Sequence, residues 1–175
     1  YDEGEEVNKK LVHHLSINTL TDEGNISFTT KIPIRKSIFK KALAKLKEGD
    51  TVSIFKFESH MALRREDKPI VLLSQGLAMS TMRPLIKRFE QDNEGIPELI
   101  SFNVNSKDTH LYEADFENVD GSLFVKYWLD SRTDYLEKIK DLAIEKKDAY
   151  YYIVGSEAFV LDSLCLLYTS PSPRD

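Results

Sequence analysis

The fold is decided by one stretch of the chain, Lys68-Pro-Ile-Val-Leu-Leu-Ser-Gln-Gly-Leu-Ala-Met-Ser-Thr-Met-Arg-Pro84. Its apolar run over residues 70–74 predicts a fully buried strand, which stops at Gly76. A helix is predicted over residues 79–91, because five apolar residues there are spaced to share one face: Met79, Met82, Leu85, Ile86 and Phe89. Ser80 or Thr81 would cap this helix, and Pro84 would then lie in its first turn.

The order of strand, glycine turn and helix N-terminus has a chemical consequence. It places free backbone N–H groups and the positive end of a helix dipole beside a bare stretch of chain. Phosphate groups bind at such positions in many proteins. A glycine turn without a ligand is the alternative interpretation of the same pattern. The stretch therefore predicts an α/β unit and indicates a phosphate-binding turn at Gly76.

The composition is that of an ordinary globular protein, since 41% of the 175 residues are hydrophobic and 30% are charged. The formal net charge of −5 argues against nucleic acid as the main partner. Cys165 is the only cysteine, which excludes a disulfide framework within the chain and fits a reducing compartment, so we expect a cytoplasmic protein. No apolar run is long enough to cross a bilayer, and the histidines lack the spacing of metal ligands.

Both ends of the chain have unusual sequences. It begins at Tyr1 rather than at a methionine, in a polar stretch. The segment from Cys165 to Asp175 resembles a translated sequencing adapter, and a genuine Ser/Pro tail is the alternative interpretation. We therefore interpret the chain as a fragment in which residues 166–175 are a non-native tail.

Residues 1–67 are predicted to be rich in β-structure. Alternating patterns predict strands over residues 11–18, 25–32 and 51–57, with a hairpin turn over residues 22–25. Ser37 is predicted to cap a short helix that ends at Gly49.

From Lys68 onward the pattern changes to strands that alternate with helices. Strands are predicted over residues 70–74, 98–103, 122–128 and 150–154, and helices over residues 79–91, 112–117, 133–145 and 158–166. Strands joined by crossover helices indicate a parallel sheet with right-handed connections. A boundary near Lys68 therefore separates a small β-domain from an α/β domain.

Several motifs, taken in order, resemble the ferredoxin–NADP reductase family of flavoprotein oxidoreductases. Tyr1-Asp-Glu-Gly-Glu5 resembles the family's Pro-Gly-Gln, and His13-His-Leu-Ser16 stands where the family has Arg-x-Tyr-Ser. The segment from Ser37 to Val52 is similar to the family's helix and Lys-x-Gly-Asp-x-Val. Leu73-Ser-Gln-Gly-Leu-Ala-Met-Ser80 stands for Ala-Gly-Gly-Ile-Gly-Ile-Thr, and Tyr151-Tyr-Ile-Val-Gly-Ser156 for a strand that ends in Cys-Gly-Pro.

The resemblance implies a fold, cofactors and an activity. Residues 1–67 would form an incomplete Greek-key β-barrel that binds FAD or FMN. Residues 68–165 would form a Rossmann-like parallel-sheet domain that binds NADPH or NADH. The implied activity is hydride transfer from the nicotinamide to the flavin, followed by electron transfer to an acceptor.

The resemblance also implies the residues that contact the cofactors, and it implies no metal. Ser16 would lie near flavin N5, and no other residue is assigned to catalysis. The flavin side would consist of His13, Leu15, Ser16 and Ser37. The dinucleotide side would consist of Gly76, Ala78, Ser80, Ser131, Arg132, Gly155 and Ser156, with Ser131 and Arg132 at the 2′-phosphate of NADP.

Three departures from the family pattern leave other functions open. His13 replaces an arginine, Leu15 replaces a tyrosine, and Ala78 replaces a glycine. One alternative is a degenerate nucleotide-binding domain without flavin chemistry, and another is an electron-transfer module of a larger redox protein. The lysines around the helix after Ser37 are interpreted first as a solvated face. Docking of an acidic electron carrier, such as ferredoxin or flavodoxin, is the alternative there.

Overall fold

The centre of the molecule is a four-stranded parallel sheet. The computed structural model describes residues 11–59, 61–106, 109–119 and 121–169. The strands stand in the order β3-β2-β1-β4, and their bounds are β1 (Ile70–Gln75), β2 (Leu99–Val104), β3 (Phe124–Leu129) and β4 (Tyr150–Val154). Residues 70–74 of β1 and all of β2 are buried, as expected for strands covered on both faces.

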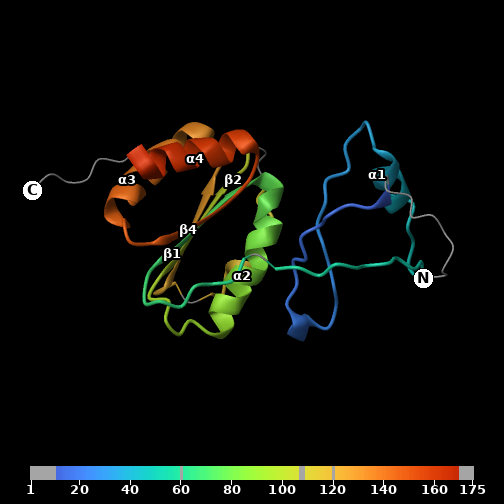
Figure 1. Cartoon of the computed structure of the whole chain (residues 1–175), viewed down its shortest axis with the longest axis horizontal. Helices are drawn as coiled ribbons and strands as arrows, with labels where there is room; N and C mark the ends of the chain where they lie inside the picture. The colour runs from blue at the N-terminus through green and yellow to red at the C-terminus, as the bar shows by residue number, and fades with distance from the viewer. Residues whose placement is uncertain (1–10, 60, 107–108, 120, 170–175) are drawn as a thin grey trace, which may run out of the picture.

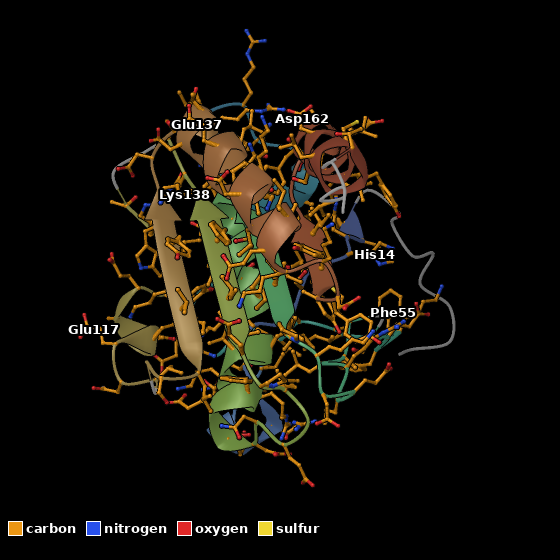
Figure 2. All side chains as sticks on the ribbon, turned by 90° about the vertical axis from the view of Figure 1, so that its left-hand side faces the viewer. His14, Phe55, Glu117, Glu137, Lys138 and Asp162 are labelled. Atoms are coloured by element: carbon orange, nitrogen blue, oxygen red, sulfur yellow. The ribbon has the colours of Figure 1, made fainter. Side chains whose placement is uncertain are left out.

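Helices cover both faces of the sheet (Figure 1). Helix α2 (Met79–Gln91) lies on one face, and α3 (Arg132–Glu145) and α4 (Glu157–Thr169) lie on the other, in front of the strands in Figure 2. A short turn of 3₁₀ helix, η4 (Ala114–Phe116), adds Phe116 to the α2 face. The fold is therefore a three-layer α/β/α arrangement.

Successive side chains of β1 enter opposite cores, because neighbouring residues of a strand point to opposite faces. Ile70 and Leu72 pack with the apolar stripe of α2, whereas Val71 and Leu73 pack against α3 and α4. All four are fully buried. Strand β1 is thus the central element on which both layers depend.

The strand order reverses beside β1, and this reversal defines where a ligand can bind. The chain proceeds from β1 through α2 to β2 and then to β3 on one side, and β4 returns to the other side of β1. Ser74 pairs with Asn103 on β2 and with Val154 on β4, so these strands end together. In open α/β sheets the crevice beyond such a reversal is the usual ligand position.

The α/β prediction is confirmed for every strand and long helix, and α2 and β4 have the expected bounds. The cap of α2 differs from the prediction. The short helix η3 (Gly76–Ala78) leads directly into it, so neither Ser80 nor Thr81 is the cap. The Ser80 hydroxyl instead donates to the Leu77 carbonyl at 2.8 Å, and Pro84 lies inside the helix rather than in its first turn.

The β-barrel expected over residues 1–67 is not formed by the described part of this region. The strands predicted over residues 11–18, 25–32 and 51–57 were wrong, since residues 11–59 contain no strand. Their one mutual backbone hydrogen bond runs from Asn18 N–H to the Ser27 carbonyl at 3.0 Å. A barrel requires every strand to be paired on both sides, and three short segments are too few to close one.

Two short helical segments are present in this N-terminal part, η2 (Thr21–Glu23) and α1 (Ile38–Leu43). Ser37 caps α1 as predicted, with its hydroxyl accepting from Lys40 N–H at 3.2 Å. Helix α1 ends at Leu43 rather than near Gly49. It has no buried residue, so no packing supports a longer helix.

The connecting segment, residues 61–67, lies along the α/β unit. Met61 and Leu63 pack on the α2-side core. The Tyr152 hydroxyl donates to the Ala62 carbonyl at 2.6 Å, and Arg65 donates to the Asp92 carbonyl at 2.9 Å beyond α2. This segment therefore contributes to the core of the unit that follows it.

Replacing Tyr135 with phenylalanine is expected to lower the free energy of unfolding by about 1 kcal/mol, because a hydrogen bond between α3 and α4 is lost. The buried Tyr135 hydroxyl lies 2.6 Å from the Ser163 hydroxyl, which itself donates to the Phe159 carbonyl at 2.7 Å. Burial raises the pKa of Tyr135 to about 12. The unfolded chain therefore ionises first, so stability falls as the pH rises above about 10. Urea unfolding at neutral and alkaline pH should show a smaller alkaline loss in the variant.

Candidate functional site

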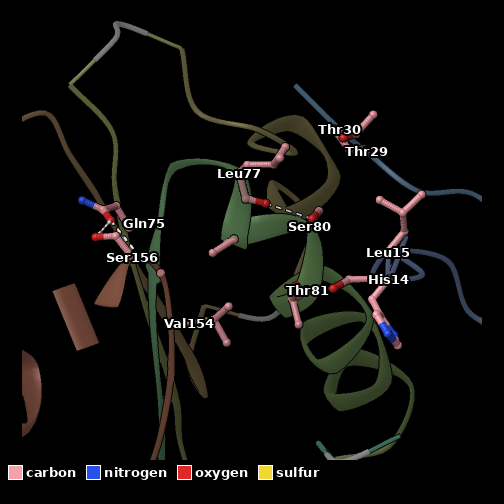
Figure 3. Close-up of a pocket in the computed structure, with 13 residues that line it drawn as sticks. His14, Leu15, Thr29, Thr30, Gln75, Leu77, Ser80, Thr81, Val154 and Ser156 are labelled. Carbon is pink, nitrogen blue, oxygen red and sulfur yellow. Dashed lines mark hydrogen bonds between the residues drawn. The ribbon is translucent and has the colours of Figure 1, made fainter. Parts of the chain in front are cut away.

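A pocket of about 360 Å³ lies at the carboxyl ends of β1 and β4, where they face the N-terminal segment (Figure 3). One wall comes from the N-terminal segment and the other from the loops that follow the two strands. The lining residues are His14, Leu15, Ser16, Thr29, Thr30, Gln75, Leu77, Ala78, Ser80, Thr81, Val154, Gly155 and Ser156. The pocket thus occupies the crevice where the strand order reverses.

The first wall element is the glycine turn after β1. Gly76 has a φ of +53°, a conformation that favours glycine. It starts the continuous helical run of η3 and α2, whose first backbone N–H groups have no partner within the helix. Leu77 and Ala78 of this run line the pocket. The turn therefore presents backbone donors and the positive end of a helix dipole to the cavity.

The second wall element is the start of α4 after β4. The Ser156 hydroxyl accepts from Phe159 N–H at 3.3 Å, and so caps α4. The amide oxygen of Gln75, at the end of β1, accepts from Ser156 N–H at 3.2 Å and from its hydroxyl at 2.7 Å (Figure 3). These bonds join the ends of neighbouring strands. Two helix N-termini therefore lie at one pocket.

Gly155 is required by close packing rather than by its backbone conformation. A Cβ atom at this position would lie 2.5 Å from Cδ1 of Phe159 and 3.1 Å from Cβ of Gln75. The Phe159 ring is buried and lies against the Tyr135 ring, with a centroid distance of 4.9 Å. Any side chain at Gly155 would therefore push α4 away from β1.

The N-terminal wall carries mostly hydroxyl groups. The Thr81 hydroxyl on α2 donates to the Ser16 hydroxyl at 3.0 Å, which fixes this segment beside the helix. Thr29 and Thr30 line the same side, and the Lys40 ammonium of α1 donates to the Thr30 hydroxyl. This wall thus offers polar groups, with a cation behind one of them.

No protein-family model and no curated protein matches the sequence. Solved structures do match. A mutant ferredoxin-NADP+ reductase from Plasmodium falciparum superposes with a TM-score of 0.73 at 14% sequence identity, over 89% of this chain and 71% of that chain. The chain has a ferredoxin–NADP+ reductase-like fold. The resemblance deduced from the ordered motifs is thereby confirmed at the level of the fold.

In this reductase-like fold, six of the residues implied by the motifs gather at one pocket. They are Leu15, Ser16, Ala78, Ser80, Gly155 and Ser156. Gly76 belongs to the same turn, next to Leu77. Their roles toward a cofactor stay predictions, whereas their proximity is a feature of the structure.

Four other implied residues lie away from the pocket. The His13 ring packs on the Phe39 ring at 4.3 Å, and Ser37 caps α1. The Ser131 hydroxyl accepts from Asp134 N–H at 3.1 Å and so caps α3. Arg132 donates to the Ala158 carbonyl at 3.2 Å and to Asp162 on α4, the residue labelled in Figure 2. As placed, Ser131 and Arg132 support the helix layer, and a phosphate contact remains a prediction.

The sequence motifs implied no contact with a cofactor for the lining residues His14, Thr29, Thr30, Gln75, Leu77 and Thr81. Gln75 carried a local signal, because it precedes the glycine of the turn. Thr29 and Thr30 carried none, because their approach to the strand ends depends on tertiary contacts. In the described residues, no three His, Cys, Asp or Glu side chains gather as a metal site would require. Among the same residues, no helix has the length and apolar character to cross a bilayer.

Arg83 of α2 holds the N-terminal wall in place. Its guanidinium donates to both Glu23 carboxylate oxygens at 2.9 Å, to Asp115 at 2.6 Å and to the Asn18 carbonyl at 2.7 Å. The hydrogen bond from Arg83 holds the pKa of Glu23 below its usual value. The hydrogen bond to Glu23 raises the pKa of Arg83 in turn. The Arg83 side chain is only 13% exposed, so these bonds are largely shielded.

Asn18 completes this junction from the other side. It is buried, and its amide donates to the Thr29 hydroxyl at 2.8 Å and to the Tyr112 hydroxyl at 2.7 Å. Its amide oxygen accepts from the Ser27 hydroxyl. Residues 18 to 29 are therefore attached to the loop after β2 as well as to α2. Thr29 is therefore held at the pocket by its bond to Asn18.

Replacing Arg83 with methionine is expected to lower stability by about 2 kcal/mol, because two carboxylates and one carbonyl lose their donor. The estimate is below that for a fully buried pair, since Glu23 and Asp115 are partly exposed. Urea unfolding measures the loss. Arg88→Met on the exposed side of the same helix is the control, with an expected change near zero. Equal stability of the two variants would contradict the role given to Arg83.

The same variant has an expected acid signature. Glu23 has a folded pKa below its unfolded value, so its contribution is present above the unfolded pKa and disappears as the pH falls through the folded pKa. In Arg83→Met, we expect this part of the acid loss to become smaller, while the Leu20 N–H bond to Glu23 preserves some of it. Urea unfolding below about pH 5 measures how steeply the free energy of unfolding falls with pH in the wild type and in Arg83→Met.

Proposed function

We propose that this chain binds a nicotinamide dinucleotide in the pocket at the ends of β1 and β4, as the dinucleotide half of a flavin-dependent oxidoreductase. One observation carries the proposal. Two helix N-termini and a glycine turn lie at the point where the strand order reverses, and Ser16 of the N-terminal segment faces them across the same pocket.

The lining suits an anionic ligand. None of the lining residues is acidic, and the backbone donors of Leu77 and Ala78 stand beside hydroxyl groups from both walls. The pyrophosphate of a dinucleotide would lie against these donors, and the nicotinamide would lie between Val154, Gly155 and the N-terminal wall. A volume of about 360 Å³ falls within the range of small-molecule sites.

The flavin side is supported by fewer groups. Ser16, Thr29 and Thr30 offer hydroxyls that would bond the polar edge of a ring, and Leu15 offers an apolar contact. A bound flavin supplies the hydride-accepting atom that side chains lack. The task of this chain is then to orient two rings and to exclude water. The bond from Thr81 to Ser16 and the Arg83 junction fix the separation of the two walls.

A second candidate function is dinucleotide binding without flavin chemistry. It is favoured by His13, which packs on Phe39 instead of facing the pocket, and by the absence of aromatic residues among those that line it. The lack of a strand in residues 11–59 points the same way. An electron-transfer module with a further redox domain is distinguished by the coding sequence on either side of the chain.

The experiment uses the purified chain as it stands. Titration with NADPH and with NADH, followed by quenching or enhancement of nicotinamide fluorescence, measures dinucleotide affinity. Absorbance after incubation with FAD or FMN measures flavin binding, and bleaching on anaerobic addition of NADPH or NADH measures hydride transfer. Bleaching supports the oxidoreductase. Dinucleotide binding to a colourless protein supports the second function, and the absence of any dinucleotide binding refutes both.

The electron acceptor would be a small molecule or an acidic carrier protein that docks on the lysines around α1. Lys36, Lys41 and Lys47 are exposed there. Opposite charges steer such encounters, and the rate then falls as salt is added. Rates of carrier reduction at low and high ionic strength compare the two kinds of acceptor.

A further inference from the structure

A buried chain of polar side chains lies directly beneath the glycine turn. The Asn103 amide at the end of β2 donates to the Ser74 hydroxyl at 2.9 Å and to the Gly76 carbonyl at 3.3 Å. The Ser74 hydroxyl donates in turn to the Phe102 carbonyl at 3.0 Å. Ser74 and Asn103 are buried, at 0% and 1% exposure. Asn103 is therefore a direct support of the turn at the pocket.

These partners fix the orientation of the Asn103 amide. A carbonyl oxygen cannot donate, so the side of Asn103 that faces the Gly76 carbonyl must be its NH₂ group. Its oxygen then faces the other way, toward Nδ1 of His110 at 3.0 Å. Since that oxygen only accepts, the bond forms only when Nδ1 of His110 carries a proton.

The other nitrogen of the same ring also faces an acceptor. Nε2 of His110 lies 3.2 Å from a carboxylate oxygen of Asp130 at the end of β3. Only a ring with two protons makes both bonds. When the ring has one proton, the two acceptors compete for it. The charged carboxylate is the stronger acceptor, so the bond to Asn103 is the one that is lost.

The His110 ring is largely covered by its neighbours. The Trp128 ring covers it at a centroid distance of 5.0 Å, and the His110 side chain is 9% exposed. Asp130 is the titratable group that contacts it from β3, and Asn103 on β2 is neutral. Lys107 and Asp108 of the same loop lie outside the described residues. Asp130 itself is 72% exposed.

We propose that Asn103 and His110 are positioning residues for the glycine turn, and that the doubly protonated ring of His110 is the form that holds the turn ready for the dinucleotide. This inference rests on the function proposed above. Loss of one proton leaves the remaining proton on Nε2, facing Asp130, and leaves the buried Asn103 oxygen without its donor. Dinucleotide affinity should therefore fall when the His110 ring loses its second proton.

The decisive variant is Asp130→Asn. An amide at position 130 can donate to Nε2, so a neutral ring can keep its proton on Nδ1 and its bond to Asn103. The wild-type affinity for NADH should fall several-fold from mildly acidic to mildly alkaline pH. The Asp130→Asn affinity should stay nearly constant. NADH is the probe because the 2′-phosphate of NADPH titrates near pH 6 and would add a slope of its own.

The controls separate this effect from other titrations. His14 lines the pocket and is the same in every variant, so the ratio of wild-type to Asp130→Asn affinity cancels its contribution. Asp141→Asn, at an exposed position of α3, should keep the wild-type slope. If NADH affinity changes equally with pH in wild type and in Asp130→Asn, the proposal is overturned.

A second measurement does not depend on dinucleotide binding. Nitrogen NMR of the His110 ring shows which nitrogen carries the proton in the neutral form. We expect Nε2 in the wild type and Nδ1 in Asp130→Asn. The same nitrogen in both would overturn the proposal. If NADH binds at no pH, the proposed function fails. The NMR result alone then decides whether Asp130 determines which nitrogen of neutral His110 carries the proton.

Discussion

Replacing Gly155 with valine is expected to destabilise the protein by about 3 kcal/mol, the upper end of the cost of overpacking. A Cβ atom alone would approach Cδ1 of Phe159 to 2.5 Å and its Cγ to 3.0 Å. Phe159 cannot withdraw, because its ring is 1% exposed and packs on Tyr135. Helix α4 must therefore move outward, and urea unfolding measures the cost.

The displacement of α4 has a functional consequence that the same variant tests. Ser156 precedes this helix, and its two bonds to Gln75 hold the β4 wall of the pocket. Dinucleotide affinity should fall together with stability. Gly121→Val is the matched control, because a Cβ atom there has no neighbour within 4 Å. If Gly155→Val is as stable as this control, the close packing described here is wrong.

A compensating substitution sharpens the test. Phe159→Leu removes the ring atoms that the new side chain would meet. We expect the double variant to lose less stability than the sum of the losses in the two single variants, since the second change relieves the clash of the first. Strict additivity would mean that Gly155 and Phe159 do not interact in the way the distances indicate.

Replacing Gly76 with valine is expected to weaken dinucleotide binding at least about tenfold, a loss of about 1.4 kcal/mol. A Cβ atom at this position has one neighbour, the Asn105 side-chain oxygen at 4.0 Å, and valine would add its methyl groups directly beside Leu77 and Ala78, which line the pocket. The backbone φ of +53° adds a strain of about 1–2 kcal/mol for a β-branched residue. Fluorescence titration with NADPH measures the affinity.

Two comparisons separate the strain from the occupied space. Asparagine tolerates the left-handed conformation, so Gly76→Asn keeps the turn but still adds a side chain. Gly49→Val places the same residue at a φ of +92° away from the pocket. We expect weak binding in both Gly76 variants and normal binding in Gly49→Val. Unchanged affinity in Gly76→Asn would argue against a phosphate at this turn.

The α/β unit could be predicted from sequence because its elements have strong local signals. The apolar run of β1 and the stripe of α2 are both determined within a few residues. The same local reasoning assigned the wrong cap to α2. A serine or threonine is a common cap, but here the short helix η3 that begins at Gly76 leads directly into α2.

The N-terminal part could not be predicted in this way. The alternation of apolar and polar residues in 11–18 and 25–32 indicates which face a strand would bury, but a strand also needs a neighbouring strand to pair with. The contacts that place this part are long-range, such as Asn18 with Tyr112 and Ser16 with Thr81. Gln75 and Ser156 likewise meet only because β1 and β4 are neighbours in the sheet. No local pattern contains these pairs.

The attachment of the connecting segment has a practical meaning for the choice of expression boundaries. A recombinant α/β unit that started at Lys68 would lack Met61 and Leu63, and would expose the apolar surface that they cover. It would also leave the Tyr152 hydroxyl without the Ala62 carbonyl. A cut at this point would thus favour self-association, whereas a start ahead of Met61 retains the native cover.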